Sequence, residues 1–110
     1  MKKFVVIYHA PAAAMAGMAT ATEEEKAKGM AAWMAWKAQH DSHILDFGAP
    51  LMGGQRLEAG GKWANSANEV SGYSLVQAES AEQLRGMLEN HLHLAWAPGC
   101  AIEIHEAVPM

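Results

Sequence analysis

KFVVIYH, residues 3–9, is the stretch that decides how this chain folds. Its β-branched and aromatic residues favour an extended strand over a helix. Successive side chains of a strand point to opposite faces, and here both faces are apolar, with Phe4, Val6 and Tyr8 on one and Val5 and Ile7 on the other. A sheet with one solvent-exposed face disfavours such a pattern. The stretch therefore predicts a strand that is covered on both sides.

The same stretch lies in an N-terminal segment that imitates a secretory signal, with two lysines, apolar residues and an Ala-x-Ala-like ending. The apolar run Phe4–Tyr8 is only five residues long, and His9 and Pro11 interrupt it before a signal core has formed. We therefore expect a strand that is retained in the folded protein.

The first predicted helix runs from Glu23 to about His40 or His43. Thr22 and Glu25 form a capping box, and three glutamates in the first turn suit the positive end of the helix dipole. The run that follows is rich in Ala, Met and Lys and contains no proline. Its large apolar side chains share one broad arc, which predicts an amphipathic helix: Met30, Trp33, Met34 and Trp36.

Three stretches give weaker signals. Residues 11–21, rich in Ala, Gly and Met, are expected to form a loop. DFGAPLMGG, residues 46–54, is expected to follow the end of the helix as an irregular stretch, because Gly48 and Pro50 break regular structure. Between residues 55 and 69, Gly60-Gly61 suggests a tight turn between short edge segments, which amounts to a weak strand or hairpin.

The C-terminal third has clear elements. GYSLVQA, residues 72–78, predicts a strand, and a capping box of Ser80 and Gln83 opens a short helix to about residue 89 or 90. HLHLAWAPG, residues 91–99, predicts a loop. CAIEIHEAV, residues 100–108, alternates as a strand does, with Ile102 and Ile104 on one face and Glu103 and His105 on the other.

The order strand, helix, weak strand or hairpin, strand, helix, strand predicts an α+β fold of one domain, residues 1–110. Two split β-α-β crossovers give a ferredoxin-like βαββαβ sandwich, an antiparallel sheet with both helices on one face. The other face would then be bare, although the first strand is apolar on both sides. A second copy of the chain is the simplest cover, so we expect a homodimer.

The composition is that of a globular chain, with 51% of 110 residues hydrophobic and 18% charged. The net charge is −4, and the longest run of like charge is Glu23–Glu25. Nucleic acid or an anionic membrane would need a basic stripe, so neither is expected as a partner. No stretch approaches the ~20 apolar residues of a membrane span. The single cysteine, Cys100, can form no internal disulfide, which favours a reducing, cytoplasmic location.

Four segments carry a resemblance to a known family: KKFVVIYHAP (residues 2–11), ILDFGAPLMGG (44–54), SGYSLVQAESAEQL (71–84) and HLAWAPGCAIEIHEAVPM (93–110). Together they resemble the YCII-related proteins, small bacterial proteins of the dimeric α/β barrel superfamily, over nearly the whole chain. The resemblance implies dimers in which two ferredoxin-like sheets pack face to face. It also implies a pocket beside the first helix and the turn that follows it.

For some members the resemblance further implies a histidine–aspartate pair that acts as an acid–base catalyst. Asp41 is the nearest match to the aspartate, offset by about one residue. The family histidine belongs in the first half of the helix, where this chain has Met30, Ala31 and Ala32. The chain departs from the family pattern there, so a partner histidine has to come from elsewhere.

The segment WKAQHDSHILDFGAPL, residues 36–51, holds the candidate catalytic groups. A carboxylate fixes the tautomer of an imidazole and stabilises its protonated form, so Asp41 with His40 or His9 could move a proton. The alternative is a solvated helix end, where histidines are favourable beside the negative pole of the dipole. His40 and His43 are three residues apart and would share a face if the helix extended that far.

The candidate ligand-binding residues are aromatic with a few polar neighbours: Tyr8, Trp33, Trp36, His43, Asp46 and His93. The alternative for the tryptophans is plain core packing. A metal site would need His40 and His43 with Asp46, or with His91 and His93, which is a sparse signature for metal binding. No phosphate-binding loop or dinucleotide fingerprint is present, so no metal and no cofactor is expected.

These features lead to two hypotheses of function. The first is a cofactor-independent acid–base enzyme of the lyase or isomerase type that acts on a small organic molecule. A covalent hydrolytic route would need a nucleophile that the sequence does not reveal. The second is a non-catalytic module for small-ligand binding or stress response on the same dimeric scaffold, because this architecture hosts many chemistries.

Overall fold

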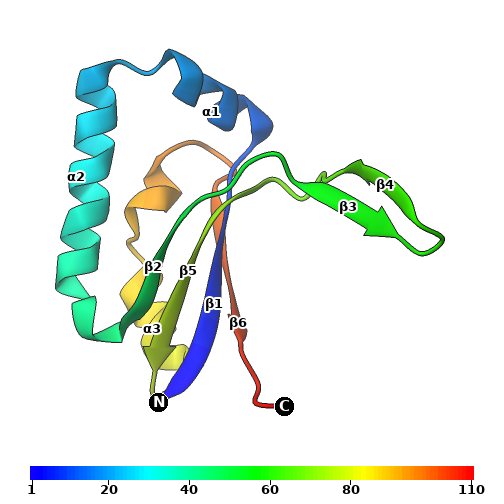
Figure 1. The fold of residues 1–110 in the computed structure, drawn as a ribbon. Coiled ribbons are helices and arrows are strands. Elements are labelled where there is room, and N and C mark those ends of the chain that lie inside the picture. Colours follow the sequence, from blue (N-terminus) through cyan, green and yellow to red (C-terminus); the bar gives the residue numbers. More distant parts are fainter.

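A computed structural model describes all residues from 1 to 110. Its centre is a four-stranded antiparallel sheet with strand order β2-β5-β1-β6 and three α-helices, an α+β fold (Figure 1). The strands of this sheet are β1 (Lys2–His9), β2 (Ile44–Pro50), β5 (Val70–Ala78) and β6 (Ala101–Glu106). The helices are α1 (Ala12–Gly17), α2 (Glu23–Gln39) and α3 (Ala81–Leu88). None of them is long and apolar enough to cross a membrane.

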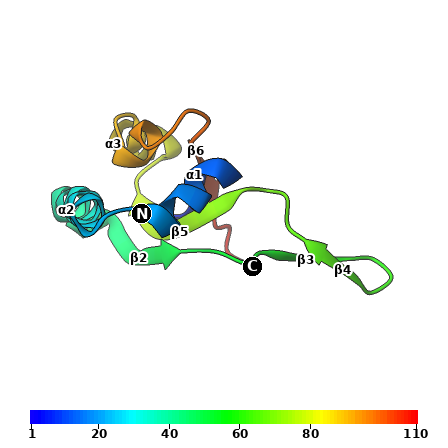
Figure 2. The ribbon, with the colours of Figure 1, turned by 90° about the horizontal axis from the view of Figure 1, so that it is seen from above.

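Helices α2 and α3 each connect two parallel strands that have a third strand between them. Helix α2 joins β1 to β2, which both pair antiparallel to β5, and α3 joins β5 to β6, which both pair antiparallel to β1. Both helices lie on the same side of the sheet (Figure 2). One face of the sheet is therefore covered by helices, and we call this the inner face.

The core lies between the inner face and these two helices. Phe4 pairs with Val76 and Val6 with Ser74, so their side chains point to the same face, and all four are at most 2% exposed. Leu84 and Leu88 of α3 and Trp36 of α2 close this core from above. Leu84 and Leu88 are four residues apart, so both lie on the face of α3 that meets the sheet.

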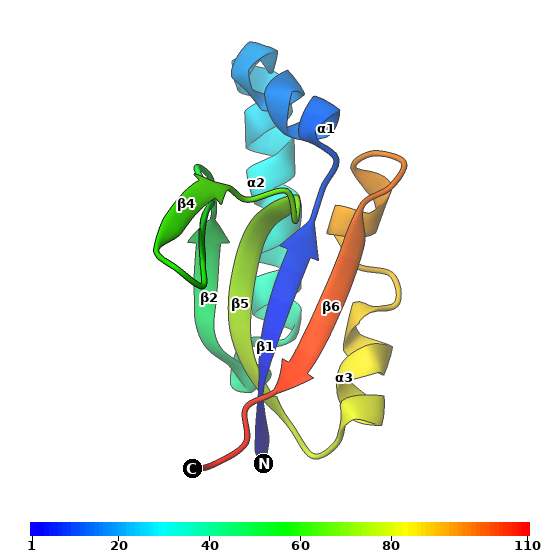
Figure 3. The same cartoon turned by 90° about the vertical axis from the view of Figure 1, so that its right-hand side faces the viewer.

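No helix covers the opposite face of the sheet, which we call the open face (Figure 3). Its centre is apolar: Val5 and Ile7 of β1 pair with Leu75 and Tyr73 of β5. These side chains are only half-buried. The first strand is therefore apolar on both faces, but only its inner face has a covering layer.

Five predicted elements are confirmed, namely β1, α2 as far as Gln39, β5, α3 and β6. Both predicted N-caps form: the hydroxyl of Thr22 accepts the N–H of Glu25 at 3.1 Å, and the hydroxyl of Ser80 accepts the N–H of Gln83 at 3.1 Å. Each cap satisfies a backbone N–H that the first helical turn leaves unpaired.

The loop predicted for residues 11–21 is wrong. Helix α1 forms there, and a 3-10 turn, η1 (Met18–Thr20), continues it. Alanine is the best helix former, and Pro11 just before the first turn loses no hydrogen bond there. These two preferences outweigh the loop signal of the small residues.

The irregular stretch predicted for residues 46–54 is also wrong at its start, because Ile44–Pro50 is β2, an edge strand of the main sheet. Its pairing with β5 shifts register twice, between Ile44 and Asp46 and between Asp46 and Ala49. Glycine and proline are tolerated in edge strands and at bulges. The stretch therefore pairs in spite of the residues that made it look irregular.

The predicted turn at Gly60-Gly61 is confirmed, but its hairpin is not part of the main sheet. Strands β3 (Gln55–Glu58) and β4 (Lys62–Asn65) form a separate two-stranded sheet. The second strand of the main sheet is therefore β2. The hairpin of β3 and β4 projects from the body of the domain (Figure 1).

Candidate functional site

Aromatic and imidazole rings gather between the inner face and the C-terminal half of α2. We call Tyr8, Trp33, Trp36, His91 and His93 the aromatic cluster. The ring of His91 lies at its centre, with ring centroids 4.7 Å from Trp36, 4.9 Å from Trp33 and 5.3 Å from Tyr8. Tyr8 also meets Trp33 edge to face at 5.1 Å. Such contacts between rings favour a well-defined arrangement of the cluster.

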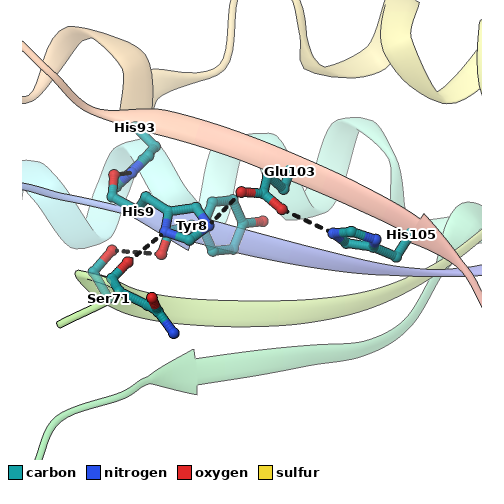
Figure 4. A network of polar contacts seen from close by, with 7 residues as sticks. Tyr8, His9, Ser71, His93, Glu103 and His105 are labelled. Carbon is teal, nitrogen blue, oxygen red and sulfur yellow. Dashed lines mark hydrogen bonds and ion pairs between the residues drawn. The ribbon is translucent and has the colours of Figure 1, made fainter. Parts of the chain in front are cut away.

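Three separate elements position these rings. Tyr8 comes from the end of β1, and Trp33 and Trp36 lie one turn apart on α2. His91 caps η3 (Leu92–Ala95), a 3-10 turn after α3, and its Nδ1 accepts the backbone N–H of His93 at 3.0 Å. The Nε2–H of His93 donates to the carbonyl oxygen of His9 at 2.8 Å, which ties this turn to β1 (Figure 4).

Two hydrogen-bond donors in the cluster have no partner. They are Nε2 of His91 and Nε1 of Trp36, in residues that are 3% and 6% exposed. Because Nδ1 of His91 accepts a hydrogen bond, the neutral imidazole carries its proton on Nε2. A buried donor without an acceptor costs about 1–3 kcal/mol. The two donors are therefore the unsatisfied polar atoms of the cluster.

Two ionisable groups of the cluster, His91 and Tyr8, are held in their neutral forms. Burial, with smaller contributions from the nearby His93 and His40, lowers the pKa of His91 to about 4. Burial raises the pKa of Tyr8 above 10.0, against the opposing effect of its hydrogen bond to Ser74. Ser74 donates to the carbonyl oxygen of Phe47 at 2.7 Å, so the hydroxyl of Tyr8 donates to Ser74 at 3.0 Å. At neutral pH His91 and Tyr8 therefore carry no charge.

The cluster lies where α2 passes from buried to exposed. Every residue from 23 to 32 is exposed, Trp33 is half-buried and Trp36 is buried. Met30 and Met34 are 60% and 47% exposed, so the predicted amphipathic arc is wrong for its two methionines. The first half of the helix has no layer to cover, and Trp33 marks the border of the cluster toward solvent.

The predicted catalytic residues do not form a pair. Asp41 is exposed in η2 (Asp41–His43), and its Oδ1 lies 3.6 Å from Nζ of Lys37. No hydrogen bond or ion pair joins it to His40 or His9. The ring of His40 packs beside Trp36 at 5.4 Å between centroids, on the rim of the aromatic cluster. Burial lowers the pKa of His40, and so does the neighbouring His43.

The remaining predicted ligand-binding residues divide into two sets. Tyr8, Trp33, Trp36 and His93 are brought together in the aromatic cluster, whereas His43 and Asp46 are not. Nδ1–H of His43 donates to the carbonyl oxygen of Gln77 at 2.9 Å. Asp46 accepts the N–H of Gly48 at 2.9 Å and the hydroxyl of Tyr73 at 3.2 Å. Both side chains thus link the β2 region to β5.

The helix ends at Gln39, so His40 and His43 do not share an α-helical face as they would on a longer helix. The five residues considered for a metal do not converge either: His40, His43, Asp46, His91 and His93. Nowhere in the structure do three or more His, Cys, Asp or Glu side chains gather in an arrangement that could hold a metal ion.

A second polar group lies on the open face and includes His9. Nδ1–H of His9 donates to the carbonyl oxygen of Asn68 at 2.9 Å, and its Nε2 lies 3.1 Å from Oε2 of Glu103, close enough for an ion pair but poorly aligned for a hydrogen bond. Nε2–H of His105 donates to the other oxygen of Glu103 at 2.8 Å (Figure 4). The hydrogen bond from His105 lowers the pKa of Glu103, and the charge of His9 contributes. The carboxylate beside a predicted histidine is therefore Glu103.

Two residues that matter here were missed as ligand-binding or catalytic residues. His91 was predicted only as a possible metal ligand. It follows directly after a capped helix, and this position indicates a turn that the helix holds in place. Glu103 was placed correctly on the face opposite Ile102 and Ile104, but its neighbour depends on the pairing of β6 with β1. That pairing is not encoded in either strand alone.

Comparison of the chain with protein-family models finds no matching family, and comparison with curated proteins finds no match.

Proposed function

We propose that the chain is a ferredoxin-like subunit of a homodimer of the dimeric α/β barrel type, akin to the YCII-related proteins. Two observations support this architecture. The strand order β2-β5-β1-β6, with both crossover helices on one face, is the order of a βαββαβ sandwich. The open face carries Val5, Ile7 and Leu75 in half-exposed positions, which a second sheet would cover.

Ile7→Glu should raise the dissociation constant of the dimer at least about 100-fold over that of the wild type, because a carboxylate in the middle of an apolar interface loses its hydration. Sedimentation equilibrium measures the dissociation constant. Ala32→Glu adds the same charge to an exposed position of α2 and should leave the constant unchanged. An unchanged constant for Ile7→Glu would contradict an interface on the open face.

For the activity we propose non-catalytic binding of a small, neutral, aromatic molecule that carries a carbonyl group. The observation that carries this proposal is the pair of buried donors without partners, Nε2–H of His91 and Nε1–H of Trp36. A carbonyl oxygen is an acceptor that needs no counter-charge, and the surrounding rings suit a flat ligand. Entry would be from the border at Trp33, beside the exposed half of α2.

The electrostatics of the cluster favour binding over acid–base catalysis. A general base works best when its pKa lies near the operating pH, whereas His91 has a pKa of about 4. The raised pKa of Tyr8 keeps its proton on the hydroxyl, which points to Ser74. Asp41 contacts only Lys37 among the charged groups. The unpartnered donors of His91 and Trp36 therefore support ligand binding over proton transfer at the cluster.

Binding can be tested by the indole N–H signals in a nitrogen–proton NMR spectrum, with Trp36→Phe identifying the signal of Trp36. Among neutral aromatic ketones and amides, compounds that bind should move this signal downfield, whereas hydrocarbons of the same shape should not. The signal of Trp63 on the hairpin serves as an internal control. His91→Asn should weaken binding about 10-fold, since one hydrogen bond contributes about 1–1.5 kcal/mol. If no carbonyl compound moves the Trp36 signal more than its hydrocarbon match, the proposal is wrong.

An acid–base enzyme of the lyase or isomerase type is the second candidate, because His9 has a carboxylate neighbour in Glu103. A carboxylate beside an imidazole can orient the ring and stabilise its protonated form, which suits general acid–base catalysis. The group lies on the open face, so a dimer would enclose it. Loss of a turnover activity in Glu103→Gln, with ligand binding at the aromatic cluster unchanged, would favour this candidate.

A further inference from the structure

The hairpin of β3 and β4 stands on the open side of the sheet. In Figure 1 it lies on the side of the sheet opposite α2, and in Figure 3 it lies in front of the open face. All eight residues of its two strands are exposed. An isolated two-stranded hairpin is at best marginally stable in water. A projecting hairpin of this kind gains stability when another surface packs against it.

The two faces of the hairpin differ: its two large apolar side chains share one face with Gln55 and Asn65, and its charged side chains lie on the other face. Leu57 and Trp63 are paired directly opposite each other, and they are 54% and 66% exposed. The adjacent pairs, which point to the other face, are Arg56 with Ala64 and Glu58 with Lys62. The charged face suits solvent, whereas the pair of Leu57 and Trp63 has nothing in its own chain to cover it.

We propose that this hairpin is an arm that packs Leu57 and Trp63 against a second copy of the chain, alongside the open face. The inference rests on the proposed dimer and adds the segment that completes its interface. Because the arm projects on the open side, a second copy seated on that face would lie next to it (Figure 3). The charged face of each arm would remain in water.

A second copy seated on the open face would need apolar surface beyond the sheet itself. Four strands at about 4.8 Å spacing and about eight residues of about 3.3 Å each cover only about 500 Å². A stable interface buries about 800 Å² on each partner. The sheet alone falls short of that area, and the arm, continuous with it through the exposed Leu51 and Met52, supplies additional apolar surface.

The test compares substitutions on the two faces of the same hairpin. Trp63→Ser and Leu57→Ser should raise the dissociation constant of the dimer at least about 10-fold in sedimentation equilibrium, whereas Arg56→Ser and Lys62→Ser should change it less than about twofold. Because all four side chains are exposed in the subunit, none of the substitutions should change its circular dichroism.

Fluorescence gives an independent measure. The emission of the wild-type protein should shift to shorter wavelength as concentration rises, because Trp63 leaves water on dimerisation, and Trp63→Phe should abolish this shift. Trp33, Trp36 and Trp96 lie away from the proposed contact and should not respond.

The outcomes separate the arm from the dimer itself. A wild-type dimer that Ile7→Glu dissociates but Trp63→Ser leaves intact would overturn the arm and leave the proposed dimer standing. A protein that is monomeric at all concentrations would overturn both. Dissociation by Ile7→Glu and by Trp63→Ser, with Lys62→Ser unchanged, would support both.

Discussion

Gly48→Ala should lower the free energy of unfolding by at least about 3 kcal/mol, the range reached when a buried contact cannot be relieved. Gly48 lies in β2 with a φ of 84°, a backbone angle that residues other than glycine rarely adopt. A Cβ atom there would lie 1.7 Å from the carbonyl oxygen of Tyr73 and 2.7 Å from its carbonyl carbon. The clash is with backbone, so β2 would have to separate from β5. Urea unfolding followed by circular dichroism measures the loss.

Two other glycines separate the causes of this effect. Gly53 also has a positive φ, of 66°, but nothing lies within 4 Å of an added Cβ, so Gly53→Ala should cost only about 1 kcal/mol. Gly29 lies in α2 in open space, and Gly29→Ala should stabilise the protein by about 0.5–1 kcal/mol. A Gly48→Ala protein as stable as Gly53→Ala would show that β2 is not held against β5 in solution.

The close approach at Gly48 also supports the candidate site. It allows the carbonyl oxygen of Phe47 to accept the hydroxyl of Ser74, which in turn accepts Tyr8. Separation of β2 from β5 would free Tyr8 to turn and would loosen the ring contacts with Trp33 and His91. We therefore expect Gly48→Ala to affect ligand binding as well as stability.

The second large effect is a loss of stability in acid that comes from His91. Its pKa is about 4 in the folded protein and 6.5 when unfolded, so between these values the unfolded chain binds more protons. The contribution of His91 to the free energy of unfolding should therefore be constant above pH 6.5 and fall as the pH is lowered toward 4. The difference between the two pKa values corresponds to about 3 kcal/mol at the acid end. Urea unfolding at a series of pH values measures this dependence.

His91→Asn is the matched variant for this prediction. The side-chain oxygen of asparagine can accept the N–H of His93 as Nδ1 of His91 does, but it does not titrate. The variant can be less stable overall because it fills less space, so the slope with pH is compared rather than the absolute value. A slope between pH 4 and 6.5 that is the same in both proteins would show that His91 is not buried in its neutral form.

Much of the fold was predictable because its signals are local. The two capping boxes lie within three residues of each helix start, and the alternation of β1, β5 and β6 repeats every two residues. Edge strand β2 was not predictable in the same way, since Gly48 and Pro50 are breakers by every local rule. It forms because β5 offers unpaired backbone groups beside it and because glycine permits the close contact with Tyr73.

The candidate site also has parts that the sequence predicted and parts that it did not. The sequence grouped Tyr8, Trp33, Trp36 and His93 with His43 and Asp46 as candidate ligand-binding residues. The structure gathers the first four in the aromatic cluster and places the other two beside β5. The sequence also placed Asp41 in a catalytic pair, which the structure does not form. The side chain of Asp41 lies beside Lys37 four residues earlier, an interaction that helical spacing permits at any exposed position.

The sequence by itself thus determined the strands and helices of the main sheet and its covering layer, apart from α1 and β2, and the apolar character of both faces of β1. Only the tertiary structure decided that His91 lies among the tryptophans without an acceptor, that Glu103 is the neighbour of His9, and that the hairpin projects past the open face. These relations join residues far apart in the chain: Tyr8 and Ser74 are separated by 66 positions, and His9 and His93 by 84. Local periodicity and capping act over a few residues, whereas such contacts depend on how strands pair and on where helices pack.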